Sequence, residues 1–225
     1  MCIRDRFNSE NIDSAILYQD SVERGAVPVL KSKVIRAILK VDSGTDETGA
    51  LKDFDLDEMI YYGFENGCYG TKMRSIIHNV EAIPHVLAQQ FKFAEKIFEN
   101  ELMPIVEPEI DINNPNKHLI EDALVKSLKD HLGKMKGKCI LKLTIPDTPN
   151  TYLPLTESNS LVRLVGLSGG YSTEQACLKL SFNRHMQASF SRALSEGLYY
   201  SDPDDYFETA ISKNISIITE ASSKG

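Results

Sequence analysis

Short apolar runs alternate with longer segments of helical periodicity along the chain, and this alternation is the feature that most constrains the fold. The runs are mostly aliphatic or β-branched, which is typical of strands buried on both faces of a parallel sheet. The seven runs are residues 15–18, 34–40, 68–72, 103–107, 139–144, 161–167 and 188–191. Strands that alternate with helices predict parallel strands joined by crossover helices, and repetition on this scale indicates an α/β barrel. Because eight strands close such a barrel, one strand is either unrecognised or absent from the chain.

Local capping signals place helices between these strands. An acceptor side chain, a capping box or a proline marks four helix starts: Asp55, Asn114-Pro115, Ser172 with Gln175, and Asp202-Pro203. Gly67 stands where a C-terminal glycine is expected. We expect frayed ends at residues 1–8 and 222–225.

Composition narrows the class of protein. At 225 residues, with 42% hydrophobic and 25% charged residues, the chain fits one globular barrel domain over residues 1–225, with residues 1–8 as a disordered or non-native leader. The net charge of −7 argues against a nucleic-acid-binding face, and no apolar run approaches the roughly 20 residues that a membrane span needs. Residues 1–10 carry no signal-peptide pattern, so we expect a cytoplasmic location.

Cysteine and histidine spacing argues against disulfides and metal sites. The four cysteines lie far apart without a C-x-x-C motif, which indicates reduced thiols that serve as small apolar residues. The five histidines form no H-E-x-x-H motif, so we interpret them as surface or helix-packing residues rather than metal ligands. A G-x-G-x-x-G or Walker A motif is also missing, which disfavours a nucleotide fold. We therefore expect no cofactor.

Polar residues recur in pairs, two positions apart, where the apolar runs end. The pairs are Lys40 with Asp42, Lys72 with Arg74, Glu107 with Glu109, and Lys142 with Thr144. Residues i and i+2 share one face of a strand, so parallel strands would collect these pairs at one mouth of the barrel. Active sites of this architecture lie at that mouth.

Lys142 is the sharpest of these signals, because it lies inside the apolar run of residues 139–145. Lysine is rarely buried unless it is paired or has a function. In general, burial and nearby cations lower the pKa of an amine, which raises its nucleophilic fraction and suits imine formation with a carbonyl. The alternative is a lysine whose stem packs while its ammonium group reaches solvent.

Glu107 and Glu109 are separated by Pro108, which fixes the backbone and removes a donor. Two carboxylates on one face can divide into a proton carrier and a charge partner when their environments differ. The alternative is a solvated loop or a salt-bridged pair. Asp42 is more simply explained as a turn or ion-pair residue.

The segment Ser168-Gly169-Gly170 follows an apolar strand and precedes a capped helix, so its amides could face an anion, although such a segment is often only a turn. Arg192 follows the last apolar run, and barrel phosphate sites are commonly built by the loops after the last two strands. Cations outnumber acids at the predicted mouth. There are five cations, namely Lys40, Lys72, Arg74, Lys142 and Arg192, and three acids, namely Asp42, Glu107 and Glu109. Cations on early and late strands suggest an anionic substrate with two phosphates.

Six motifs occur in order along the chain: Leu39-Lys40-Val41-Asp42, Gly70-Thr71-Lys72-Met73-Arg74-Ser75, Pro104-Ile105-Val106-Glu107-Pro108-Glu109, Leu141-Lys142-Leu143, Leu167-Ser168-Gly169-Gly170-Tyr171-Ser172 and Ala188-Ser189-Phe190-Ser191-Arg192-Ala193-Leu194. Together they resemble class I (Schiff-base) fructose-bisphosphate aldolase in its bacterial form, from about Ile12 to the end of the chain. The resemblance implies a TIM (β/α)8 barrel and reversible cleavage of fructose 1,6-bisphosphate to dihydroxyacetone phosphate and glyceraldehyde 3-phosphate, in glycolysis and gluconeogenesis. It also implies a homo-oligomer in the full-length form.

The resemblance assigns roles by position. Lys142 would form the imine, and Glu107 would be the main general acid/base. Glu109 and Lys72 would tune Glu107 and hold Lys142 neutral. The phosphate near the ketone would bind Ser168, Gly169 and Arg192, and the other phosphate would face Lys40 and Arg74.

Two departures from the family are visible. Nothing here matches the family's initial segment, which holds the first barrel strand and an acidic active-site residue, so we expect a chain that is truncated at its N-terminus. The C-terminal tyrosine of the animal enzymes is also missing. Two alternatives therefore stay open: a catalytically impaired aldolase fragment, or another Schiff-base lyase that acts on a monophosphorylated sugar.

Overall fold

The computed structural model describes residues 38–41, 44–199 and 201–224, and within them six strands form one sheet. The strands are β1 (Ile38–Val41), β2 (Gly70–Ile76), β3 (Met103–Glu109), β4 (Cys139–Thr144), β5 (Leu161–Leu167) and β6 (Met186–Ala188). Every neighbouring pair is parallel, and the order across the sheet is the order along the chain. A sequential parallel order without a reversal is the topology of a β/α barrel rather than of a doubly wound sheet.

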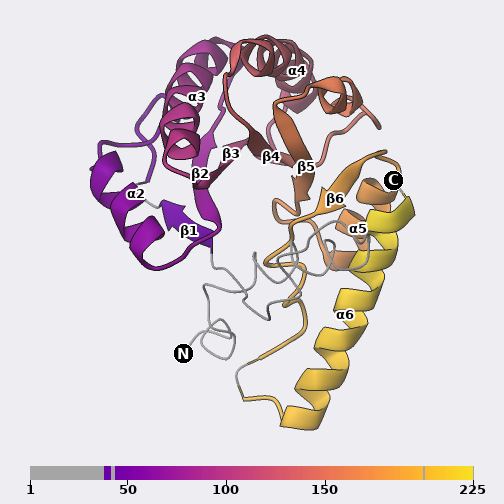
Figure 1. The fold of residues 1–225 in the computed structure, drawn as a ribbon. Coiled ribbons are helices and arrows are strands. Elements are labelled where there is room, and N and C mark those ends of the chain that lie inside the picture. Colours follow the sequence, from indigo (N-terminus) through magenta and orange to yellow (C-terminus); the bar gives the residue numbers. More distant parts are fainter. Residues whose placement is uncertain (1–37, 42–43, 200, 225) are drawn as a thin grey trace.

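Helices follow the strands and surround the sheet on its outer side (Figure 1). The α-helices are α2 (Leu56–Glu65), α3 (Ile83–Glu99), α4 (Lys117–Lys134), α5 (Thr173–Ser181) and α6 (Asp204–Lys224), and the short 3-10 helices are η3 (Val80–Ala82) and η4 (Leu153–Glu157). Helix α3 packs against β2, β3 and α4, while α6 packs against α5 and β6. In Figure 1 the strands form an arc from β1 to β6, which are the two edges of the described sheet.

The two faces of the sheet bury different residues. The outer face and the helices share one large core, with Met73, Val106 and Leu141 among its strand residues. The inner face has its own small apolar cluster, which contains Ile38, Ile105, Ile140 and Val165. The inner cluster comes from four different strands, so it forms an apolar layer inside the arc, as barrel interiors do.

Most of the predicted strands are present, with shifted ends. The run at 15–18 and the start of the run at 34–40 lie outside the described residues, whereas residues 139–144 and 161–167 match β4 and β5. Strands β2 and β3 extend past their predicted ends, because Arg74 and Glu109 still belong to the β2–β3 ladder. The run predicted at 188–191 is wrong in its bounds, since β6 covers residues 186–188.

Three of the four predicted helix starts are confirmed. Asp55 accepts a hydrogen bond from the Glu58 amide at the start of α2, and Ser172 forms the capping box of α5. Helix α6 begins at Asp204, directly after Asp202-Pro203.

The start predicted at Asn114-Pro115 is wrong, because α4 begins at Lys117. The Asn114 side chain instead accepts a hydrogen bond from the Asn116 amide and donates one to the His78 carbonyl. The asparagine therefore forms a turn before the helix instead of capping it.

The expectation of a frayed end at residue 222 is also wrong. Helix α6 continues to Lys224, and Ser222 is buried. Its hydroxyl accepts a hydrogen bond of 2.9 Å from the Ala188 amide of β6. This bond satisfies a backbone donor of an edge strand, which would otherwise face the helix without a partner.

Three cysteines are buried free thiols, as predicted, and Cys2 lies outside the described residues. Burial raises the pKa of the Cys139 thiol to about 12 and that of Cys177 to about 11. The thiolate is the reactive species. We therefore expect iodoacetamide at pH 8 to alkylate Cys139 at least about 10³-fold more slowly in the native protein than in denaturant, as followed by mass spectrometry. Equal rates in the two conditions would contradict the buried position of Cys139.

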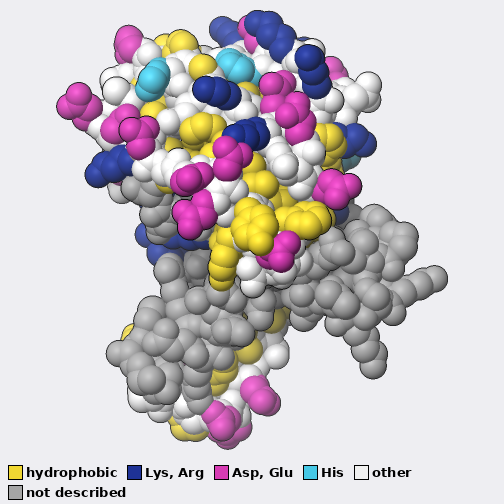
Figure 2. Space-filling model, turned by 60° about the vertical axis from the view of Figure 1, so that its left-hand side comes forward, with side chains coloured by type: hydrophobic (Ala, Val, Ile, Leu, Met, Phe, Trp, Pro, Cys, Tyr) yellow, Lys and Arg dark blue, Asp and Glu magenta, His cyan; other side chains and the backbone are white. Residues whose placement is uncertain are grey.

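The surface in Figure 2 mixes acidic and basic side chains over the face that shows α2 and α3. Several exposed aromatic residues lie on α2, namely Tyr61, Tyr62 and Phe64. Among the described helices, none combines the length and apolar character of a membrane-crossing segment.

Candidate active site

Three charged side chains from neighbouring strands converge inside the arc. Lys142 of β4 is 4% exposed, and its Nζ lies 3.5 Å from Oε1 of Glu107 on β3. Lys72 of β2 places its Nζ 3.7 Å from the other oxygen of Glu107. The Lys142 ammonium group therefore does not reach bulk solvent, and the alternative of a snorkelling lysine is excluded by its burial.

Glu107 is the centre of this cluster, and it is 3% exposed. Both of its ion pairs are longer than a normal hydrogen bond. Its Oε2 accepts no hydrogen bond from any residue in the described part of the chain. A buried carboxylate oxygen with spare acceptor capacity, beside an amine, is well placed to receive a proton from a bound hydroxyl group and to return it.

The register of the sheet explains why these residues meet. Lys72 faces Ile105 in the ladder between β2 and β3, so Glu107 lies two residues further along the same face. Lys142 faces Val165 of β5, which belongs to the inner apolar cluster. The side chains at i and i+2 therefore share the inner face, as the alternation predicted.

The ladder between β3 and β4 contains only two residue pairs, and Thr144 connects the ends of these two strands. Its hydroxyl donates to the Ile110 carbonyl at 2.7 Å and accepts from the Ile110 amide at 2.9 Å. Both bonds lie just beyond Glu109, at the carboxyl ends of the strands. This link fixes β4, which carries Lys142, to β3, which carries Glu107.

Arg74 and Glu109 form a second ion pair next to the first cluster, with 2.5 Å between Nε and Oε2. The structure thus places Glu109 with Arg74 rather than with Lys142. Lys40 is exposed and stands opposite Lys72 in the ladder between β1 and β2, while Asp42 lies outside the described residues. Lys40, Lys72 and Arg74 therefore line one side of the opening.

Ser168, Gly169 and Arg192 lie together beyond the end of β5. Ser168 is buried, and its carbonyl accepts a hydrogen bond from the Tyr171 amide, which closes a turn. Gly169 has a φ of 61°, and a Cβ there would lie 2.6 Å from Ile112, so only glycine fits. A Cβ on Gly170 would lie 3.9 Å from Nη1 of Arg192, which shows that the guanidinium stands beside the turn.

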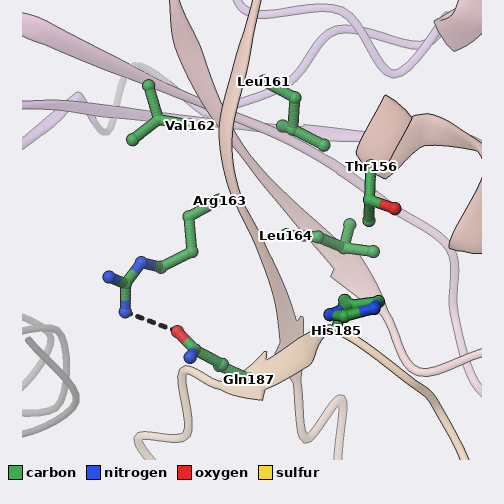
Figure 3. Close-up of a pocket in the computed structure, with 7 residues that line it drawn as sticks. All are labelled: Thr156, Leu161, Val162, Arg163, Leu164, His185 and Gln187. Atoms are coloured by element: carbon green, nitrogen blue, oxygen red, sulfur yellow. Dashed lines mark hydrogen bonds between the residues drawn. The ribbon is translucent and has the colours of Figure 1, made fainter. Parts of the chain in front are cut away.

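Sequence reasoning missed Arg163, which lies in the middle of apolar β5 just as Lys142 lies in β4. Arg163 and Gln187 reach toward each other, with 2.5 Å between Nη1 and Oε1 (Figure 3). They line a pocket of about 320 Å³ together with Thr156, Leu161, Val162, Leu164 and His185. The signal that could have found Arg163 is the one used for Lys142, a cation within an apolar strand.

The histidines are placed as predicted, on the surface or against a helix. Four of them are exposed, and the ring of His131 packs 4.9 Å from that of Phe91. No three His, Cys, Asp or Glu side chains in the described segments converge on a common metal position.

Fold and site together define a parallel β/α barrel with a buried lysine and carboxylate inside it. No family model matches the chain. The class 1 fructose-bisphosphate aldolase of Clostridium acetobutylicum is 39% identical over 231 residues, which cover 96% of this chain and 78% of that protein. The enzyme of the same name from Synechocystis sp. is 38% identical, over 96% of this chain and 77% of that protein.

Among solved structures, fructose-bisphosphate aldolase from Plasmodium falciparum, crystallised with TRAP and a small-molecule inhibitor, matches with a TM-score of 0.60 at 20% identity. The match covers 89% of this chain and 71% of that chain, and it supports the predicted TIM-barrel fold. The sequence relatives show the family: this chain belongs to the class 1 fructose-bisphosphate aldolases. The family predicted from the six motifs is confirmed.

Proposed function

We propose that the chain cleaves fructose 1,6-bisphosphate reversibly through an imine on Lys142. The observation that carries the proposal is the buried Lys142 amine, 3.5 Å from the buried Glu107 carboxylate. A buried amine beside a proton carrier is the arrangement that imine chemistry with a ketone requires. The family to which the chain belongs supports this choice of substrate.

The chemistry follows from the positions of these two groups. The Lys142 nitrogen adds to the ketone carbon, and the ketone oxygen leaves as water after it has gained protons, for which Glu107 is the nearest carboxyl group. The resulting iminium accepts the electron pair when the bond between the next two carbons of the sugar chain breaks. This leaves an enamine, and the hydroxyl-bearing carbon on the other side of the broken bond becomes an aldehyde as its hydroxyl group loses a proton. Protonation of the enamine carbon restores the iminium, and water then hydrolyses it, which releases the ketone product and restores the amine.

The cations around the opening suit the two phosphates of this substrate. We assign the phosphate nearer the ketone to Ser168, Gly169 and Arg192, which converge beyond β5. We assign the other phosphate to Lys40 on β1 and Arg74 on β2. In the sheet, these two strands are separated by β3 and β4 from β5, which precedes Ser168. Arg74 already pairs with Glu109, so that carboxylate would orient the guanidinium. Lys72 is the remaining cation, and its ammonium group contacts the Glu107 carboxylate, as that of Lys142 does.

Borohydride trapping with dihydroxyacetone phosphate tests the proposal directly. Reduction of the imine should add the mass of the reduced ketone phosphate to one peptide, with Lys142 as the modified residue. Adducts spread over surface lysines, or no adduct on Lys142, would refute it. Cleavage of a one-phosphate ketose at a rate comparable to that of fructose 1,6-bisphosphate would instead favour a lyase for monophosphorylated sugars. We further propose a single barrel domain and a homo-oligomer for the full-length form.

A further inference from the structure

A second lysine, Lys117, is buried and is not part of the cluster around Lys142. It opens helix α4, is 2% exposed, and has three partners. Its Nζ lies 2.5 Å from Oε1 of Glu121, 3.0 Å from Oδ1 of Asp147 and 3.0 Å from the carbonyl oxygen of Ile145. All three donors of the ammonium group therefore have an acceptor.

Two of the three partners of Lys117, Ile145 and Asp147, belong to the segment where β4 leaves the sheet. Ile145 comes three residues after Lys142, so the bond to its carbonyl holds the exit of the strand that carries the proposed nucleophile. Glu121 reinforces this connection, because its Oε2 accepts a hydrogen bond of 3.1 Å from the Asp147 amide. Helix α4 is thus joined to the β4 exit by two side chains.

A second branch leads from Asp147 to the phosphate turn. Lys179 of α5 places its Nζ 3.4 Å from Oδ1 of Asp147. The same ammonium group lies 5.1 Å above the ring of Tyr171, within cation–π distance. Tyr171 closes the turn by donating its amide to the Ser168 carbonyl. The segment that follows Lys142 and the Ser168–Gly170 turn are therefore connected through Asp147.

The charges of this network depend on one another. Burial raises the pKa of Glu121, although the hydrogen bond from Lys117 opposes the rise. Burial would also raise the pKa of Asp147, but the hydrogen bond from Lys117 and the charges of Lys117 and Lys179 outweigh it, so this pKa lies below its usual value. Buried ion pairs are often no more stabilising than apolar residues of the same volume. A gain in stability is therefore a weak explanation for the buried ion pair of Lys117 and Glu121.

We propose that Lys117, Glu121 and Asp147 form a positioning network for the aldolase reaction. The network fixes the distance between Lys142 and the Ser168–Gly170 turn, so that a ketone held by its phosphate presents its carbonyl carbon to the amine. The inference rests on the proposed function and adds residues that touch neither the substrate nor Lys142. A displacement of about 1 Å at such a site can reduce reactivity about 10²-fold.

Two variants separate positioning from stability. Lys117→Met removes the cation and leaves the buried Glu121 carboxylate without it. The double variant Lys117→Met with Glu121→Leu replaces the buried ion pair by apolar residues, which is often neutral for stability. Lys126→Met is the matched control, because Lys126 is exposed on the same helix. Thermal unfolding of each variant identifies those that are folded.

The measurement is the rate of borohydride-trapped adduct formation at Lys142, with dihydroxyacetone phosphate and with unphosphorylated dihydroxyacetone. For the double variant we expect the rate with the phosphorylated ketone to fall about 10- to 100-fold. The rate with dihydroxyacetone should stay near the value of the unaltered chain, because that ketone does not use the turn. Lys126→Met should leave both rates unchanged.

Each of the other possible outcomes would contradict either the positioning role of the network or the proposed function. Unchanged rates with both ketones in the folded double variant would show that the network is only structural. An equal loss with both ketones would show damage to Lys142 itself rather than to spacing, and it would also overturn the inference. Failure of the unaltered chain to form any adduct at Lys142 would refute the proposed function instead, and the inference would fall with it.

Discussion

Replacement of Lys142 by methionine is expected to reduce the rate of fructose 1,6-bisphosphate cleavage by about 10⁵-fold or more, because the imine can no longer form. Methionine has a similar length and suits the buried position, so the fold should be kept. Glu107 would still have Lys72 at 3.7 Å. The measurement is a coupled assay for the triose phosphate product, with circular dichroism to verify the fold.

Substrate binding gives this prediction its control. Lys142→Met leaves Ser168, Gly169 and Arg192 in place, so calorimetric binding of the bisphosphate should remain within about tenfold of the unaltered chain if the phosphates supply most of the affinity. Cleavage at an unchanged rate by the folded variant would remove Lys142 from the mechanism. Weak binding together with lost activity would instead indicate a disturbed site.

Replacement of Glu107 by glutamine is expected to reduce kcat by about 10²- to 10⁴-fold, the range typical of a general acid/base. Glutamine preserves the shape of the buried side chain but cannot carry the proton. The imine step should slow as well, since water loss from the addition intermediate needs an acid near the ketone oxygen. Rapid-quench borohydride trapping would separate this step from bond cleavage.

Glu109→Gln is the matched control for Glu107→Gln. Glu109 follows two residues later on the same strand face, but its carboxylate contacts Arg74 rather than Lys142. We expect its replacement to raise KM through Arg74 and to change kcat far less than Glu107→Gln does. If the two variants showed the same loss of kcat, the division of roles between the two carboxylates would be wrong.

The strand and site positions that could be predicted from the sequence are those with a strong local signal. Lys142 was visible because a cation inside an apolar strand conflicts with burial unless it has a partner. The same conflict at Arg163 was overlooked. Paired residues such as Lys72 and Arg74 could be placed on one face by alternation alone, since the strand period is two.

The choice of ion-pair partner could not be predicted, because it depends on the stagger between neighbouring strands. In the ladder between β2 and β3, Arg74 is paired with Glu107, yet its side chain contacts Glu109, which lies two residues further along β3. Lys117 was missed for a related reason. In the sequence it stands among polar residues that resemble an exposed helix start, and only the approach of Ile145 and Asp147 buries it.

The hydrogen bond from the Ala188 amide to Ser222 has a consequence for the phosphate side of the site. Strand β6 is an edge of the described sheet and only three residues long, and the loop that carries Arg192 begins just beyond it. The final turn of α6 therefore holds the start of that loop in position through this hydrogen bond. Strain or added bulk near residue 222 would loosen the anchorage of Arg192, although about thirty positions of sequence separate the two.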